Sequence, residues 1–219
     1  MNQSARTVLF VFGVLLSALS AAMLAPALAD LQDDAQAASA FFGSSMIGLA
    51  VGGIMAFMGR GSENRLNARS AIILTGGSWV LLSAAAAVPL MLADLGLSWT
   101  DALFETTSGI TTTGATVLTG LQDMPAGVLL WRSILQWIGG VGIIVTAMAI
   151  WPLLGIGGMQ LFRLESSDTS EKMLPRAGQI AGAVSLVYLA LTFGCFIAYL
   201  AADMTPFDAV NHAMTTVAT

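Results

Sequence analysis

The chain has 219 residues, of which 56% are hydrophobic and only 10% are charged, and its mean hydropathy is +0.81. Soluble domains carry about 25% charged residues, so this composition excludes an ordinary water-soluble globule and indicates a protein solvated mostly by lipid. The formal net charge of -5 provides no basic surface for nucleic acid, and the single Cys195 excludes an intrachain disulfide.

Five apolar runs are long enough to cross a membrane, which takes about 20 residues in a helix. In chain order they are residues 7–29, 37–58, 71–93, 126–151 and 177–202. Ala27, Leu28 and Ala29 resemble a signal-peptidase site. The apolar stretch before them exceeds the usual length, so we expect the first span to stay uncleaved. The expected fold class is an all-α polytopic membrane protein.

The basic residues predict the orientation of these spans. With alternating spans, seven of the eight fall on one side, which the positive-inside rule makes cytoplasmic together with the N-terminus. These seven are Arg6, Arg60, Arg65, Arg69, Arg163, Lys172 and Arg176. This count requires residues 94–125 to enter and leave the membrane from the outer side without crossing it.

Residues 99–110 predict a short helix within that segment. At twelve residues it would be roughly 18 Å long, too short to span about 30 Å of hydrocarbon. Ser98 or Thr100 is suited to cap its start, where Asp101 and Glu105 would complement the positive end of the helix dipole.

A hydroxyl-rich stretch follows, with seven Thr and one Ser between residues 106 and 120. Non-helical backbone at membrane depth is tolerated only where protein buries it or where it lines a wet cavity. The sequence therefore favours a re-entrant loop whose carbonyls replace the water around a cation, with Gly114 supplying the unusual dihedral angles. The plain alternative is a polar external loop that turns at Gly114.

An internal repeat favours the re-entrant loop. Residues 101–112 align without a gap with residues 208–219, and each segment follows a spanning helix. Asp101 pairs with Asp208, Thr112 with Thr219, and Ser108 with Thr215. The same alignment places His212 opposite Glu105.

Three motifs, DALFETTSGITTTGATVL, WRSILQWIGGVGIIV and GGMQLFRLESSD, resemble the Trk/Ktr potassium transporter superfamily, most closely its TrkH-type membrane subunit. The resemblance covers nearly the whole chain from Trp99. It implies helix–pore-loop–helix repeats preceded by a two-helix hairpin, four such repeats around one pore, a homodimer, and a cytosolic nucleotide-binding regulatory subunit of the TrkA type. Since one repeat and part of a second cannot enclose such a pore, we expect an N-terminal part of a longer protein.

The resemblance also implies site residues. Thr112, Thr113 and Gly114 match the first selectivity filter, and Thr219 would open the second; the transported ion would be K⁺. Residues in supporting places are Thr111, Ala115, Thr116, Ala218, Glu105 and Arg132. The implied divisions are a hairpin with its cytoplasmic loop over 1–69, a first repeat with its linker over 70–176, and the start of a second repeat over 177–219.

Two further sets of residues leave alternatives open. Arg132 either pairs with Glu105, Asp101 or Asp123 as an electrostatic brace behind the filter, or extends to the interface. Glycines recur mid-span at 139, 140 and 142, and with small-residue spacing at 48/52 and 178/182. We expect close helix packing there rather than hinges.

Potassium conduction therefore competes with two other functions. One is a non-conducting membrane scaffold with external Thr-rich loops. The other is an intramembrane serine hydrolase using Ser108 and His212, which the repeat alignment disfavours because it pairs Ser108 with Thr215. No covalent chemistry is needed for conduction.

Overall fold

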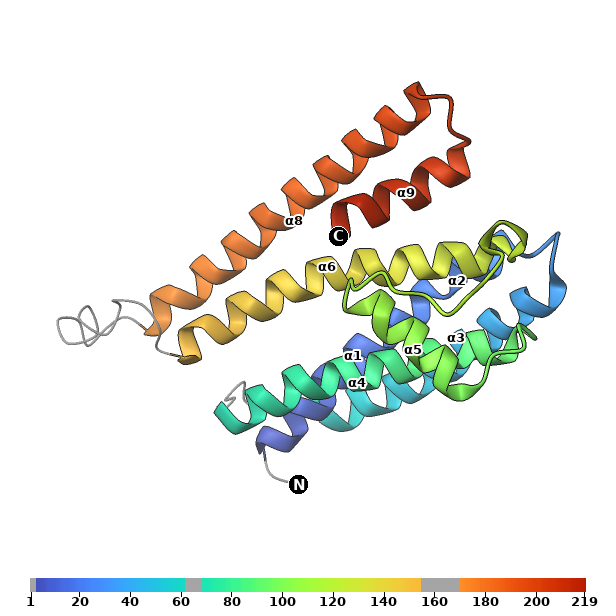
Figure 1. Ribbon diagram of the computed structural model, residues 1–219. Helices are drawn as coiled ribbons and strands as arrows, with labels where there is room; N and C mark the ends of the chain where they lie inside the picture. Colours follow the sequence, from blue (N-terminus) through green and yellow to red (C-terminus); the bar gives the residue numbers. More distant parts are fainter. Residues whose placement is uncertain (1–2, 62–67, 155–169) are drawn as a thin grey trace.

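The computed structural model describes residues 3–61, 68–154 and 170–219, and of residues 68, 145–154 and 170–181 only the helical backbone (Figure 1). This described part contains helices and no strand, in agreement with the expected all-α class. The elements are α1 (Gln3–Ala22), α2 (Leu24–Ala29), α3 (Ala35–Gly59), α4 (Ala68–Leu92), α5 (Trp99–Ile110), the 3-10 turn η1 (Leu121–Asp123), α6 (Ala126–Leu154), α8 (Ser170–Ala201) and α9 (Pro206–Ala218).

Five helical stretches in the described residues are long and apolar enough to span a membrane, which matches the five expected spans. The first of them is broken at Met23 into α1 and α2. Pro26 explains the break, because a proline ring clashes with the carbonyl four residues earlier, here that of Ala22, the last residue of α1. The expected single helix over 7–29 is therefore two consecutive helices.

Helices α1 and α3 pack against each other through glycines. A Cβ at Gly13 would overlap the backbone of Ala56, and one at Gly52 would overlap Ser17. Such close backbone approach is the usual role of small residues between membrane helices. The expectation for the 48/52 pair is thus confirmed. Gly182 differs, because no heavy atom of the described chain lies within 4 Å of its Cβ position.

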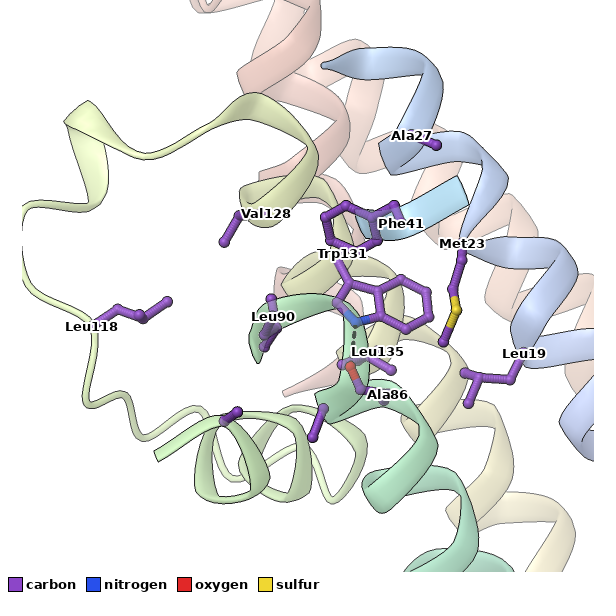
Figure 2. Close-up of a cluster of buried hydrophobic side chains, with 12 residues drawn as sticks. Leu19, Met23, Ala27, Phe41, Ala86, Leu90, Leu118, Val128, Trp131 and Leu135 are labelled. Atoms are coloured by element: carbon purple, nitrogen blue, oxygen red, sulfur yellow. Dashed lines mark hydrogen bonds between the residues drawn. The ribbon is translucent and has the colours of Figure 1, made fainter. Parts of the chain in front are cut away.

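Trp131 of α6 joins this hairpin to the rest of the molecule. Its ring is fully buried and meets Phe41 of α3 edge-on, with ring centroids 5.9 Å apart. Its Nε1 donates a hydrogen bond of 3.1 Å to the carbonyl of Ala86 in α4. Figure 2 shows the indole between Met23, Phe41 and Ala86, so a single side chain contacts α3, α4 and the junction of α1 and α2.

Asp30 forms a second link between hairpin and α6. Its side chain is fully buried, and its Oδ1 accepts a hydrogen bond of 2.6 Å from the backbone N–H of Gly127, at the start of α6. A carboxylate at a helix N-terminus complements the helix dipole. Burial nevertheless raises the pKa of Asp30 above its ordinary value of 3.8, and the charges of Asp34 and Asp33 add to that rise.

Helix α6 lies between two groups of helices. In Figure 1, α8 and α9 lie on one side of it, and α1, α3, α4 and α5 lie on the other. Two hydrogen bonds join α8 to α6. Trp137 Nε1 donates to Thr192 Oγ1 at 3.0 Å, and the Tyr188 hydroxyl donates to the Trp137 carbonyl at 3.1 Å. Hydrogen bonds of this kind join helices in membranes, where apolar contact alone gives no preference over lipid.

Candidate functional site: a re-entrant helix and its returning segment

The short helix α5 spans Trp99–Ile110, the range expected from the sequence. Ser98 is its N-cap rather than Thr100. The Ser98 hydroxyl accepts a bond from the Asp101 N–H, and the Asp101 carboxylate accepts one from the Ser98 N–H at 3.1 Å. This reciprocal capping box satisfies two amide groups that the first turn of a helix leaves unpaired.

The other end of α5 closes in a Schellman motif. The N–H of Thr113 donates to the carbonyl of Ser108, and that of Thr112 to the carbonyl of Gly109, both at 2.9 Å. The motif places Thr112 in the left-handed region, with φ 57°. Glycine is usual there, and a β-branched residue in that conformation is strained by roughly 1–2 kcal/mol. The chain has Thr112 despite this cost, which is typical of functional sites.

The returning segment runs back alongside α5. Gly114 has φ 74°, in the left-handed region that residues with a side chain rarely adopt, so glycine allows the chain to turn back here. The Ser108 hydroxyl donates to the Ala115 carbonyl at 2.5 Å. One turn earlier on α5, the Glu105 carboxylate accepts bonds of 3.0 Å from the Thr116 hydroxyl and the Val117 N–H. These contacts make the expected helix-and-return geometry.

A buried ion pair stands behind this segment. Arg132 Nε of α6 lies 2.5 Å from Glu105 Oε1, and the Glu105 side chain is only 1% exposed. Of the three partners considered for Arg132, the structure selects Glu105; Asp101 is engaged in the α5 cap. The Glu105 carboxylate therefore contacts the guanidinium of Arg132 on one side and the returning segment on the other.

Several carbonyls of the returning segment are left free by these contacts. Within the described residues, the carbonyl oxygens of Thr111, Thr112, Thr113 and Gly114 accept no hydrogen bond, and neither do that of Ile110 before them and those of residues 116–119 beyond them. The carbonyl of Ala115, between the two free stretches, does accept one. Unpaired carbonyls at membrane depth are costly unless water or an ion satisfies them. The stretch before Ala115 includes Thr112, Thr113 and Gly114, the residues that the sequence resemblance assigns to the first filter, and Thr111, which it places in a supporting role.

Glycines of α6 position the ends of both short helices. A Cβ at Gly139 would overlap the carbonyl oxygen of Ile110, the last residue of α5. A Cβ at Gly140 would overlap the Tyr188 hydroxyl and lie 3.3 Å from Ala218, the last residue of α9. Gly139 is thirteen residues into α6, about 20 Å along its axis. The last residue of α5 therefore lies beside the middle of α6 and not beside its first residue, Ala126.

Helix α9 repeats the features of α5. Its N-cap Thr205 accepts a bond from the N–H of Asp208, the residue aligned with Asp101. Ala209, aligned with Ala102, is fully buried as Ala102 is. Thr219 follows α9, and both its N–H and its hydroxyl donate to the Thr215 carbonyl. His212, aligned with Glu105, lies against the Tyr199 ring at 5.9 Å between centroids.

Two contacts were missed by the sequence analysis. Ser108 was considered only as a nucleophile, although its alignment with Thr215 already indicated a hydroxyl needed at that position in both repeats. The bond from Gly127 to Asp30 joins residues 97 positions apart, so no local pattern indicates it.

The TrkH family model, described as a cation transport protein, matches residues 37–219. The Trk system potassium uptake protein TrkH of Vibrio parahaemolyticus is 42% identical over 97% of this chain and 44% of the relative, and that of Escherichia coli is 38% identical over 97% and 45%. The Trk system potassium uptake protein TrkI of Halomonas elongata is 50% identical over 67% of this chain and 30% of its own length.

Among solved structures, the crystal structure of the potassium transporter TrkH from Vibrio parahaemolyticus superposes with a TM-score of 0.82 at 39% identity. The superposition covers 95% of this chain and 42% of that structure's chain. The chain thus spans less than half the length of these relatives. With its five apolar helices it is a multi-pass inner-membrane protein, and it belongs to the TrkH family of cation transport proteins.

Proposed function

We propose that this chain takes part in potassium uptake by supplying the first pore loop of the ion path. The observation that carries the proposal is the set of free carbonyls from Thr111 to Gly114. Helix α5 holds this stretch through Ser108, which bonds the Thr113 N–H and the Ala115 carbonyl. Such oxygens can replace the hydration shell of a dehydrated cation. The relatives named as potassium uptake proteins and the likeness to a potassium transporter support K⁺ as the transported ion.

In this proposal Thr112, Thr113 and Gly114 coordinate the ion with their carbonyls, and Thr219 opens the equivalent second loop after Ala218. Thr111 leads into the first loop, and Ala115 and Thr116 lead out of it. The Glu105–Arg132 pair keeps the returning segment in place from behind. The membrane potential drives the ion inward, with or without a coupled ion.

We also propose the orientation, division and partners that the sequence resemblance implies. The N-terminus lies in the cytoplasm, and the α5 cap and η1 lie at the outer face. The chain divides into a hairpin over 1–69, a first repeat over 70–176 and a second repeat beginning at 177. A homodimer and a cytosolic nucleotide-binding subunit of the TrkA type complete the assembly.

The contacts give less support to the alternatives. In the described chain the Ser108 hydroxyl is bonded to the Ala115 carbonyl and His212 lies against Tyr199, and no hydrogen bond joins Ser108 to His212. This arrangement does not favour a serine hydrolase. A non-conducting scaffold would not explain the strained backbone of Thr112 or the unpaired carbonyls beside it.

Replacing Gly114 tests the proposal. Both Gly114 and Gly120 have left-handed dihedral angles, φ 74° and φ 68°, and neither Cβ position is sterically blocked. Serine at either position therefore costs roughly the same 1–2 kcal/mol of backbone strain. Only Gly114→Ser is expected to lower the K⁺/Na⁺ uptake ratio, measured in a bacterial strain without its own potassium-uptake systems. Unchanged potassium-limited growth and an unchanged ratio in Gly114→Ser would remove Gly114 from the filter.

A further inference from the structure

Ser108 is bonded to the returning segment on both sides of Gly114. Its backbone carbonyl accepts the N–H of Thr113 at 2.9 Å, and its hydroxyl donates to the carbonyl of Ala115 at 2.5 Å. The residue itself is only 5% exposed, which shields that hydroxyl from water. One buried residue of α5 therefore fixes both neighbours of Gly114.

Gly114 has no comparable restraint of its own. Apart from its chain neighbours, no heavy atom of the described chain lies within 4 Å of its Cβ position, and neither its N–H nor its carbonyl takes part in a hydrogen bond there. Its position therefore depends on Thr113 and Ala115. A glycine held only through its neighbours adopts many conformations when one of those restraints is removed.

The bond to Ala115 also removes one oxygen from the row of free carbonyls. A carbonyl that accepts a short bond from a buried hydroxyl is directed toward the donor and is less available to a cation. The free carbonyls of the filter residues, up to Gly114, are separated from those of residues 116–119 because the carbonyl between them, that of Ala115, is taken by Ser108.

We infer that Ser108 is a positioning residue for ion selectivity: its hydroxyl ends the coordinating carbonyl row at Gly114 and, through Ala115, sets how far Gly114 extends toward the ion. This inference rests on the proposed function and deepens it. Ser108 does not touch the ion; it acts through the backbone of Ala115.

The second repeat carries the same donor. Thr215 of α9 is aligned with Ser108, and its hydroxyl donates to the carbonyls of Asn211 and His212 within its own helix, both at 3.1 Å. The two repeats thus share a hydroxyl at this helical position, although that of Thr215 is bonded within α9 and that of Ser108 to the returning segment. Threonine is therefore the conservative replacement at position 108.

The test compares variants of the whole gene product in a strain without other potassium-uptake systems, with uptake normalised to the amount of protein in the membrane. The K⁺/Na⁺ uptake ratio and the apparent KM for K⁺ are measured for wild type, Ser108→Ala, Ser108→Thr and Ser108→Cys. Thr106→Val is the matched control. It removes another buried α5 hydroxyl, whose bond of 2.9 Å goes to Ser83 in α4 and not to the loop.

Ser108→Ala is expected to lower the K⁺/Na⁺ ratio and raise the apparent KM by about fivefold each, the factor carried by one net hydrogen bond. Ser108→Thr is expected to stay within about twofold of wild type. Ser108→Cys, a weak donor, is expected to lie between them. Thr106→Val is expected to lower the thermal stability without changing the ratio.

Wild-type ratio and KM in Ser108→Ala would overturn the inference and leave the proposed function intact. If Ser108→Ala does not accumulate in the membrane, wild-type values in Ser108→Cys overturn it instead. A ratio equally altered in Ser108→Thr and Ser108→Ala would also overturn it, because the hydroxyl would then not be the determinant. If the wild-type protein gives no K⁺ uptake in this strain, that result would overturn the proposed function and this inference with it.

Discussion

Glu105 shows how a single side chain decides the form of the loop. Its carboxylate is 1% exposed, yet it has three donors: Arg132, the Thr116 hydroxyl and the Val117 N–H. A buried charge is tolerated only with such a set of partners. The sequence indicated the pair but left Glu105, Asp101 and Asp123 as candidates, since only the fold brings Arg132, 27 positions away, to one of them.

Removing Arg132 is therefore expected to destabilise the protein strongly. Arg132→Met leaves the Glu105 charge buried with only hydroxyl and amide donors, at a cost of about 3–5 kcal/mol. Adding Glu105→Gln removes that charge and is expected to recover part of the loss. The measurement is thermal unfolding of the purified protein in detergent. Arg69→Met, at an exposed arginine, is the control; a similar loss of stability in both single variants would contradict a specific role for the ion pair.

Asp30 predicts a pH dependence of stability. Its pKa in the folded protein is raised above 3.8, so the folded state favours the protonated form. The stability this contributes is fully present below the unfolded value and is lost as the pH rises through the raised value. Asp30→Asn keeps an acceptor for Gly127 and stays neutral. It is expected to unfold at a higher temperature than wild type at pH 8, with the difference shrinking toward pH 4.

Asp30→Ala separates the bond from the charge. It leaves the buried Gly127 N–H without an acceptor, at a cost of about 1–3 kcal/mol at every pH. Thermal unfolding measured across this pH range checks both variants. An Asp30→Asn curve parallel to wild type would show that the carboxyl does not titrate differently in the folded state.

At the scale of elements, glycines decide which helices approach most closely. The sequence predicted close packing at each glycine group, but spacing alone does not separate 48/52, which pack against α1, from Gly182, which meets open space in the described chain. The difference arises because packing needs a second surface, which local sequence does not specify. Within α6, Gly139 and Gly140 are the positions where α5 and α9 end.

Gly139→Ala is expected to displace α5 and its loop. The added Cβ would overlap the Ile110 carbonyl, which belongs to backbone and cannot rotate away as a side chain can. Such overpacking costs about 1–3 kcal/mol and here also moves the free carbonyls of the loop. Reduced K⁺ uptake and a lower unfolding temperature are the expected results. Gly142→Ala is the control in the same helix, because its nearest heavy atom is 3.6 Å away; equal effects of the two changes would contradict this account.

For the whole molecule, the distribution of charge predicts the orientation in the membrane. Arg6, Arg60 and Arg69 lie at one end of the hairpin and first repeat, while Asp30, Asp101 and Asp123 lie at the connections at the other end. Arg65 and Arg163, which belong to the same prediction, lie outside the described residues. The positive-inside rule then places the first group in the cytoplasm.

Cysteine labelling tests this orientation. In a Cys195→Ser background, Gln122→Cys in η1 and Gln3→Cys at the start of α1 both introduce an exposed thiol. A membrane-impermeant maleimide applied to intact cells with a permeable outer membrane is expected to label position 122. Position 3 should react only after the inner membrane is opened. The reverse pattern would invert the proposed topology and, with it, the direction in which the loop faces.

The sequence by itself determined the five spans, the twelve-residue helix and the segment that follows it. Apolar length, capping residues and turn-forming residues act within a few positions of each other, so a linear pattern contains them. Only the tertiary structure decided that Arg132 meets Glu105, that Asp30 caps α6 and that Ser108 holds Ala115. It also decided which glycines pack closely against a neighbouring helix. Each of these contacts depends on which surfaces are brought together when distant segments pack.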